Sequence, residues 1–383
     1  MQKFRRITQH AALVLLLAWP LAAQAQLQSE PVPNIVTLSV PYPETYAMVH
    51  DFAFGSLIDS SFSLVDIETR RFKGMLSAGQ FATLNHSVAR GEFYVGETIH
   101  SRGVRGERQD FVAVYDFANL ALQAEIELPP RRANTVINLG NSAVTADDRF
   151  LLIWNQNPGT SVSVIDLDKR ALAGEIPAPG CALVYPDAAG GFVMLCGDGK
   201  LLAVTLDAAG AEASRWSSAA FNDIDNDPLS EKAASIDGVW HFVSYGGEVQ
   251  PIDVSGDTPR ILDRWWLTSA EERAANWRPA GWHWTAGHDS GRLWVGMTPD
   301  GYEGSHKDPA PEAWLFDTAS GERLARFELR VPGLSFAATE GEEPKLLAVN
   351  IAGQLDIYDG GTGEWLRTVG SLGETPYMVH AIQ

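Results

Sequence analysis

The chain has 383 residues and a formal net charge of −19, because 29 Lys and Arg stand against 48 Asp and Glu. Its 45% hydrophobic content is typical of a globular protein rather than a disordered one. The acidic balance disfavours a nucleic-acid partner, since phosphates attract Lys and Arg. With only two cysteines, the chain is neither a disulfide-dense scaffold nor the holder of a metal site built from four thiolates.

Residues 1–25 have the pattern of a secretory signal. A basic stretch precedes an apolar run over 11–23, which is shorter than the roughly 20 residues needed to cross a bilayer. A small-x-small motif at 23–25 predicts cleavage before Gln26. We therefore expect an exported protein, periplasmic in a Gram-negative cell, with a short N-terminal arm over 26–45 and no membrane-spanning segment. An uncleaved membrane anchor is the alternative.

One sequence pattern recurs along the rest of the chain. Alternating apolar positions end in Asp, a turn follows, and a second short strand is expected after it. The copies at 317–327 and 359–369 are especially alike. Successive copies are about 40 to 65 residues apart, and periods of this order indicate a repeat architecture. The pattern ends at Asp66, Asp116, Asp166, Asp207, Asp253, Asp317 and Asp359.

The repeat has a direct physical meaning. Period-two alternation buries one face of a strand, and an Asp at the strand end accepts backbone N–H groups and starts a turn. One such sheet cannot bury its own faces, so the copies must pack against one another. We therefore predict an all-β fold, a seven-bladed β-propeller of the WD40/YVTN-like type over residues 46–383. An irregular β-sandwich is the alternative, but it does not require seven copies of one pattern.

The longest interval between copies contains an insertion. Within it, residues 269–277 begin with a Ser, and two acidic residues follow at 271 and 272. A Ser cap followed by acids in the first turn is typical of a helix start. We expect one short helix there.

The two cysteines, Cys181 and Cys196, flank one expected hairpin. If Tyr185 faces Phe192 across this hairpin, the two cysteines also face each other. Opposed residues of an antiparallel pair have Cα atoms about 4.5–5.5 Å apart, within reach of a disulfide. In an oxidising compartment we therefore expect a Cys181–Cys196 bond, with two buried free thiols as the alternative.

Motifs for catalysis are missing from the sequence. There is no G-x-S-x-G elbow, no H-E-x-x-H pair and no P-loop. The histidines show no metal-ligand spacing, and the acidic stretch at 223–227 lacks the Gly and the distal Glu of an EF-hand loop. From these residues alone we expect no catalytic residue, no metal ligand and no cofactor-binding residue in this chain.

Several longer stretches resemble a known family. The segments at 103–116, 124–129, 276–282 and 321–327 are similar to the large (heavy, α) subunit of quinoprotein amine dehydrogenases, a family that includes aromatic amine and methylamine dehydrogenases. The stretch at 299–307 looks more like the aromatic branch. The setting of the two cysteines also fits the disulfide of that subunit. The resemblance runs from about residue 45 to the C-terminus, although Ala280 stands where the family usually has Gly.

The resemblance implies a function and a set of partners. Family members are seven-bladed propellers in a periplasmic complex of two large and two small subunits. The small subunit carries tryptophan tryptophylquinone and the catalytic aspartate, and it oxidises primary amines to aldehyde and ammonia. Electrons then pass to a blue-copper protein such as amicyanin or azurin. A chain with two cysteines is the scaffold rather than the short, cysteine-rich small subunit.

One residue carries over from the family to the substrate channel. In the family, a large-subunit phenylalanine from the first blade lines this channel, and Phe54 is the best match within 50–57. Phe52 is the alternative register, and a core aromatic of the first blade is the structural alternative.

Two other functions compete with the amine dehydrogenase interpretation. The first is a stand-alone periplasmic propeller that binds a partner or ligand and has no redox activity. The second is an autonomous propeller enzyme such as a lactonase, which requires acids or histidines around a metal at the propeller axis.

Overall fold

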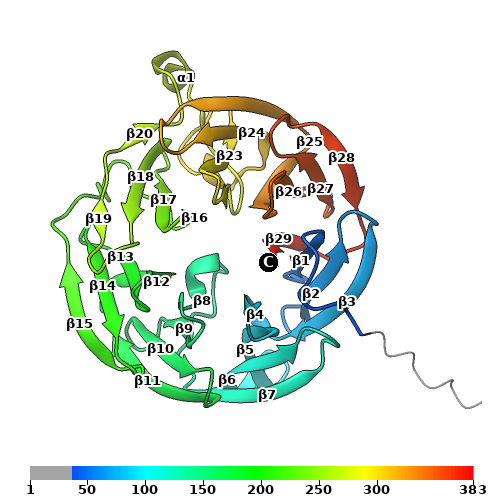
Figure 1. Cartoon of the computed structure of the whole chain (residues 1–383), viewed down its shortest axis with the longest axis vertical. Coiled ribbons are helices and arrows are strands. Elements are labelled where there is room, and N and C mark those ends of the chain that lie inside the picture. The colour runs from blue at the N-terminus through cyan, green and yellow to red at the C-terminus, as the bar shows by residue number, and fades with distance from the viewer. Residues whose placement is uncertain (1–36, 383) are drawn as a thin grey trace, which may run out of the picture. The chain divides into compact units, whose positions relative to one another are not determined.

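Antiparallel strands arranged in a ring make up residues 37–382, the part of the chain that the computed structural model describes (Figure 1). The signal and most of the arm expected before residue 46 lie outside the described residues. Two sheets come first along the chain. The first consists of β1 (Tyr46–Asp51), β2 (Ser60–Asp66), β3 (Arg71–Ala78) and β29 (Pro376–Ala381). The second consists of β4 (Gln80–Ser87), β5 (Glu92–Arg102), β6 (Arg105–Asp116) and β7 (Leu122–Leu128).

Three further sheets follow in chain order. The third contains β8 (Ser142–Val144), β9 (Phe150–Asn155), β10 (Ser161–Asp166) and β11 (Ala171–Pro177). The fourth contains β12 (Cys181–Pro186), β13 (Phe192–Cys196), β14 (Leu201–Leu206) and β15 (Glu212–Ser217). The fifth contains β16 (Ala234–Ile236), β17 (Val239–Val243), β18 (Glu248–Asp253), β19 (Arg260–Ile261) and β20 (Trp265–Trp266).

The remaining strands form one continuous eight-stranded sheet. It is held together by the long strand β25, which pairs with β24 on one side and with β26 on the other. Its members are β21 (Arg278–Pro279), β22 (Thr285–His288), β23 (Arg292–Thr298), β24 (Ala310–Asp317), β25 (Arg323–Ala338), β26 (Lys345–Asn350), β27 (Leu355–Asp359) and β28 (Trp365–Val369).

The all-β propeller is as predicted, but the number of blades is not. Five sheets of four or five strands are regular blades, and the last two copies of the repeat share the eight-stranded sheet. The prediction of seven separate blades is therefore wrong, and the structure has five blades and this joined sheet. The physical reason is β25, which stays extended over 16 residues from one copy into the next, so that no break separates them.

The ring is closed by the two ends of the described chain. Strand β29 pairs with β1, with Ala47 opposite Ala381 and His50 opposite Met378. Strand β29 is the innermost strand of the first sheet, and Figure 1 shows it near the centre of the ring together with β4, β8, β12 and β16. This pairing places the loop after β1 beside the segment that precedes β29.

The turn aspartates behave as the repeat predicted. Each of the seven carboxylates accepts at least one backbone N–H from the turn that follows it, for example Glu68 N–H on Asp66 at 3.0 Å. These bonds satisfy donors that the turn would otherwise leave without a partner. The same bond is present at Asp116, Asp166, Asp207, Asp253, Asp317 and Asp359.

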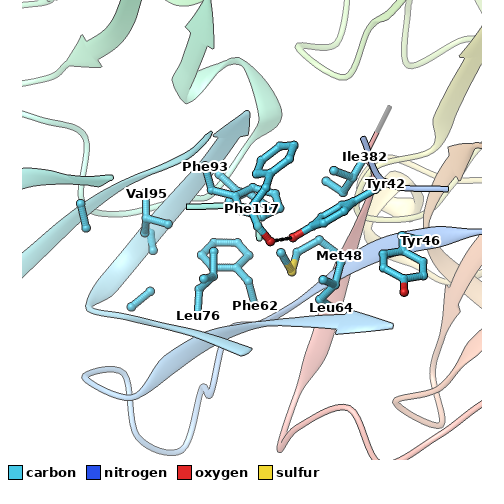
Figure 2. Close-up of a cluster of buried hydrophobic side chains, with 14 residues drawn as sticks. Tyr42, Tyr46, Met48, Phe62, Leu64, Leu76, Phe93, Val95, Phe117 and Ile382 are labelled. Carbon is cyan, nitrogen blue, oxygen red and sulfur yellow. Dashed lines mark hydrogen bonds between the residues drawn. The ribbon is translucent and has the colours of Figure 1, made fainter. Parts of the chain in front are cut away.

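Hydrophobic clusters between neighbouring sheets form the core. Figure 2 shows one of them, which contains Phe62 of the first sheet and Phe93 of the second. Tyr42, which precedes β1, donates its hydroxyl hydrogen to the carbonyl oxygen of Phe117 at 2.6 Å and so ties the described start of the chain into this cluster. Burial of such large side chains between sheets is the main stabilising contribution.

The insertion forms the expected short helix. Helix α1 (Ala270–Ala274) begins at Ser269, whose hydroxyl accepts the N–H of Glu272 at 3.2 Å. Arg323 of the eight-stranded sheet donates to the Glu272 carboxylate at 2.9 Å, which holds the helix to the ring. Two 3-10 turns, η1 (Leu139–Asn141) and η2 (Ser305–Lys307), complete the regular structure of residues 37–382. No helix in this range is long and apolar enough to cross a membrane.

Candidate functional site

Phe54 lies in the loop between β1 and β2 and is exposed. Its side chain keeps 46% of its surface accessible, whereas Phe52 is buried at 4%. The rings of Phe52 and Phe54 meet at right angles, with centroids 5.5 Å apart. Of the two phenylalanines that the sequence offered as channel residues, only Phe54 is exposed enough to contact a bound molecule, and the buried Phe52 ring packs against the Phe54 ring.

The backbone of this loop is fixed by a buried carboxylate. Asp51, which is 5% exposed, accepts the N–H groups of Ala53 at 3.0 Å, Glu374 at 2.8 Å and Thr375 at 2.7 Å. Gly373 has φ +141°, and a Cβ there would lie 2.1 Å from Asp51 Oδ2. Asp51 therefore fastens the Phe54 loop to the segment before β29, and Gly373 permits the close approach.

Aromatic and apolar side chains from distant segments meet beside Phe54. We call this group the aromatic cap. Trp282, from the connection between β21 and β22, donates its indole N–H to the carbonyl oxygen of Ile137 at 3.2 Å. This bond joins the segment before β8 to the eight-stranded sheet. The cap consists of Phe52, Phe81, Ile137, Trp282, Tyr377 and Met378.

A cavity of about 590 Å³ lies among the innermost strands. Strands from all six sheets line it, and they bring His86, His283 and His380 to its wall. Burial lowers the pKa of both His283 and His380 to about 3, with neighbouring Lys232 and His86 adding to the respective effects. These imidazoles are therefore neutral near pH 7. His380 Nε2 and Ser142 Oγ have no hydrogen-bond partner among the described groups, so the cavity wall retains free polar atoms.

The acidic loop at 223–227 uses its carboxylates in hydrogen bonds within its own turn and with the turn between β17 and β18. Asp223 accepts the N–H of Asn226 at 3.2 Å, and Asp227 accepts the Ser244 hydroxyl at 2.7 Å and the Gly246 N–H at 2.7 Å. Within residues 37–382, no three His, Cys, Asp or Glu side chains are grouped so that they could hold a metal ion.

The cysteine pairing is confirmed. Cys181 and Cys196 are disulfide-bonded and lie directly opposite each other in β12 and β13. The register assumed for the rest of the hairpin is wrong by one residue, because Tyr185 faces Val193 rather than Phe192. An irregularity between Ala182 and Tyr185 takes up this shift, so the cysteines still meet.

Two further exposed apolar side chains belong to the Phe54 loop and to the hairpin beside it. Ile58, in the same loop, is 48% exposed, and Val104, at the tip of the β5–β6 hairpin, is 57% exposed. A Cβ on Gly103 would lie 3.8 Å from Ile58 Cδ1, so the loop and the hairpin tip are neighbours. We call Phe54, Ile58 and Val104 the loop–hairpin patch. Exposed apolar side chains on neighbouring loops are common at interaction sites.

A buried arginine anchors the base of this hairpin. Arg132 is 1% exposed and donates to Thr98 Oγ1 at 2.8 Å and to the carbonyl oxygen of Gln80 at 3.2 Å. Its own N–H is bound by Asp110 at 3.0 Å, and Asp110 also pairs with Arg108 at 2.8 Å. Since Thr98 and Asp110 belong to β5 and β6, this network holds the patch-bearing hairpin rigidly on the ring.

Sequence reasoning did not predict the positions of Tyr377 and Trp282 beside the Phe54 loop. Both rings contact the Phe52–Phe54 pair or each other, although they are more than 200 residues from it along the chain. The signal that could have found Tyr377 is the propeller itself, because closure of the ring pairs the last strand with the first.

The fold and the site together define a propeller-type protein with exposed aromatic and apolar side chains and with a mostly apolar axial cavity whose wall carries three histidines. The family model for the methylamine dehydrogenase heavy chain (MADH) matches residues 46–383. The chain therefore belongs to the methylamine dehydrogenase heavy chain family.

Individual relatives agree with this assignment. The heavy chain from Paracoccus versutus is 31% identical over 353 residues, which cover 90% of this chain and 81% of the relative. The heavy chain from Methylophilus methylotrophus is 27% identical over 321 residues, covering 82% and 78%. Among solved structures, a functionally unknown protein from Desulfotomaculum acetoxidans has a TM-score of 0.59 at 10% identity, covering 88% of this chain and 98% of that one. That likeness concerns the fold alone.

Proposed function

We propose that this chain is the large, non-catalytic subunit of a periplasmic amine dehydrogenase. In this proposal, a small subunit carries tryptophan tryptophylquinone and oxidises primary amines, aromatic or methylamine-like, to aldehyde and ammonia. A blue-copper protein such as amicyanin or azurin accepts the electrons. The complex contains two large and two small subunits. Membership of the heavy chain family is the observation that carries the proposal.

The small subunit would dock on the face that carries Phe54. The loop–hairpin patch offers it exposed apolar side chains on a rigid base, and interfaces favour apolar and aromatic anchors of this kind. Arg102 and Arg105 at the hairpin tip are exposed as well, in a chain whose net charge is −19. A partner with an apolar centre and acidic residues at the rim would complement this face.

The quinone, when bound in the small subunit, supplies the redox chemistry. The residues of the present chain would act by positioning and by excluding water. Phe54 projects from a loop whose backbone is bound by Asp51 at Ala53 and by Thr375 at Phe54 itself, so its backbone is held in place before any amine binds. An aromatic wall against the substrate would keep water from the amine carbon and limit the size of the substituent.

Co-expression tests the proposal directly. The tagged chain, expressed with its own export signal and together with its neighbouring genes, should co-purify with a small protein that stains for quinone. The purified complex should reduce a dye when given primary amines. A chain that is recovered alone and colourless, and that gives no amine-dependent reduction, would overturn the proposal. A stand-alone binding propeller would give that result, and metal analysis of the same sample would detect a metal-dependent propeller enzyme.

A further inference from the structure

The axial cavity lies at the ends of the innermost strands that point away from the Phe54 loop. In the first sheet its lining includes residues 379–381 of β29, which pair with residues 47–49 of β1, whereas Phe54 follows the other end of β1. In the second sheet it includes residues 84–86 of β4, which pair with the start of β5 and not with the hairpin tip at Val104. The cavity at the centre of the ring (Figure 1) is therefore separate from the loop–hairpin patch.

The cavity opens to solvent beside three of the innermost strands. Ala146 and Ala188 are exposed lining residues that follow β8 and β12, and Ser235 is an exposed lining residue of β16. These three residues mark a mouth through which a small molecule can enter. The cavity volume of about 590 Å³ is in the usual range of small-molecule sites.

Aromatic rings give the cavity an apolar wall. Tyr185, Trp240 and Phe336 line it, and the rings of Tyr185 and Trp240 lie 5.1 Å apart between centroids. The Tyr185 hydroxyl donates to the carbonyl oxygen of Glu231 at 2.8 Å. The Trp240 indole N–H donates to the carbonyl oxygen of Pro186 at 2.9 Å. Because the polar ends of both side chains are already hydrogen-bonded, their rings remain to contact an apolar ligand.

Three enclosed polar atoms of the lining residues have no hydrogen-bond partner among the described groups. They are Asn85 Oδ1 on β4, Ser142 Oγ on β8 and His380 Nε2 on β29. Asn85 Nδ2 donates to the carbonyl oxygen of Ser142 at 3.2 Å, so two of these residues are neighbours. Buried polar atoms in folded proteins are nearly always hydrogen-bonded. A hydroxyl group both donates and accepts, so it suits an amide oxygen, a hydroxyl and an imidazole nitrogen alike.

The charges of the wall favour a neutral ligand. Among the described residues that line the cavity none is Lys or Arg, whereas Asp187 and Glu231 are acidic. Burial lowers the pKa of His283 and His380 to about 3, so these two imidazoles give an anion no positive charge near pH 7. The Asp187 carboxylate already accepts a backbone N–H at 2.7 Å, and Lys232 offsets the charge of Glu231 beside it. Neither an anion nor a cation would be repaid here for the water that it loses.

We propose that the axial cavity is a small-molecule site for neutral aromatic compounds that carry a hydroxyl group, such as phenols. The ring of the ligand packs against Tyr185, Trp240 and Phe336, and its hydroxyl pairs with the enclosed polar atoms of the wall. Strands from all six sheets form this wall, so a bound ligand joins the sheets and stabilises the folded ring. The site goes beyond the proposed function, because it lies away from Phe54 and needs no quinone.

Three probes of similar shape test the chemistry of the site. Equilibrium dialysis at pH 7.5 measures their binding to the purified protein in the assembly that it forms. Neutral 2-naphthol carries a hydroxyl group, naphthalene lacks it, and 2-naphthoate is an anion. We expect one saturable site per chain for 2-naphthol, with a dissociation constant at least about tenfold lower than for the other two probes. The melting temperature should rise with the concentration of 2-naphthol.

Binding of 2-naphthol that does not saturate would overturn the proposal. Naphthalene that binds as tightly would show that the hydroxyl group is not recognised, and 2-naphthoate that binds as tightly would show that the wall accepts an anion. Either result overturns the proposed ligand class. The measurement reports binding rather than amine oxidation, so its outcome and that of the proposed function are distinguishable.

Ala188→Trp tests the location, because it places an indole at the mouth of the cavity. Ala189→Trp is the matched control, since Ala189 is the next residue, is exposed as well and does not line the cavity. We expect Ala188→Trp to weaken 2-naphthol binding at least about tenfold and Ala189→Trp to bind as the wild type does. Ser235→Trp, on another side of the mouth, should act as Ala188→Trp does.

Thermal unfolding without ligand shows whether each variant folds, which we expect because all three positions face solvent. Two independent mouth positions keep the location testable if one variant does not fold. Unchanged binding in the folded mouth variants, or an equal loss in Ala189→Trp, would show that 2-naphthol binds elsewhere and would overturn the axial site.

Discussion

The indole N–H of Trp282 donates to the carbonyl oxygen of Ile137 at 3.2 Å, between residues that are 145 positions apart in the chain. This bond crosses from the connection between β21 and β22 to the segment before β8. It ties two sheets together at the aromatic cap, where Phe52, Met378 and Ile137 are all buried. The cap therefore depends on a polar contact as well as on packing.

Trp282→Phe should lower stability by about 1–2 kcal/mol. The variant keeps an aromatic ring but leaves the Ile137 carbonyl oxygen without its donor, and an unsatisfied buried acceptor costs about this much. Urea unfolding at pH 7.5 measures the effect. Trp216→Phe is the control, because Trp216 is 37% exposed on the edge strand β15 and has no described hydrogen bond through its indole. Equal effects of the two substitutions would contradict this role of the Trp282 indole.

Loss of the disulfide should destabilise the chain without changing its fold. The bond between Cys181 and Cys196 closes a loop with a sequence separation of 15, and the chain-entropy model assigns about 3 kcal/mol to a loop of this size. The double variant Cys181→Ser/Cys196→Ser should unfold at correspondingly lower urea. Adding a reductant should destabilise the wild type and leave the double variant unchanged. Because the small subunit would carry the quinone, quinone stain should persist in the mutant complex, and its loss would show a different role for this pair.

Acidification below about pH 6.5 should destabilise the chain. Burial lowers the pKa of His283 and His380 to about 3 and that of His241 to about 4. The unfolded chain binds protons on these imidazoles from pH 6.5 downward, whereas the folded chain does not. The free energy of unfolding then falls by up to about 1.4 kcal/mol per pH unit for each histidine. Glu97, whose pKa burial raises to about 7, acts in the opposite direction between pH 4.5 and 7.

Urea unfolding at pH 7.5, 6.5 and 5.5 tests the balance between the buried histidines, which include His50 because burial lowers its pKa as well, and the carboxyl groups, such as Glu97, whose pKa burial raises. His241→Gln should reduce the acid dependence, because it removes one of the groups that titrate only in the unfolded chain. A wild type that becomes more stable between pH 6.5 and pH 5.5 would show that the buried imidazoles do not control this range.

Local signals in the sequence were sufficient for the strands, the turns and the disulfide. Asp66 and its six counterparts act within their own turns, so a few neighbouring residues determine the structure there. The number of blades was not predictable in the same way. Sequence periodicity marks the copies of the repeat, but hydrogen bonding decides whether two successive copies form separate sheets. Strand β25 pairs with both β24 and β26, so the last two copies share one sheet.

The site shows the same division between local and distant contacts. Phe54 could be named from its surroundings in the sequence, since the family resemblance covers its loop. Tyr377 could not, because its position beside Phe54 depends on closure of the ring by β29 and β1. The Thr375 contact with Phe54 joins residues 321 positions apart, and no local pattern encodes such a pairing.

Phe54→Ala should change amine preference more than stability. The side chain is 46% exposed, so its removal should cost less than about 1 kcal/mol of unfolding free energy. In the assembled complex we expect the ratio of kcat/KM between aromatic and short amines to shift, because the wall beside the substituent is removed. Dye-reduction kinetics over an amine panel measure this ratio. Kinetics that remain the same for short and aromatic amines would count against a channel role for Phe54.

Ile58→Glu should weaken assembly with the small subunit. Ile58 belongs to the loop–hairpin patch, is 48% exposed and lies next to Gly103 of the β5–β6 hairpin. A carboxylate there would have to lose water on docking without a partner of its own, and we expect at least about a tenfold loss of affinity. The substitution should leave the isolated chain folded, because the side chain already faces solvent.

Titration of the small subunit against the tagged large chain measures this affinity. Phe72→Glu is the control, since it places the same charge on an exposed apolar position of the outer strand β3, where exposure is 59%. We expect Phe72→Glu to assemble as the wild type does. If Ile58→Glu assembles normally and Phe72→Glu does not, the small subunit docks at the outer rim of the ring rather than on the face that carries Phe54.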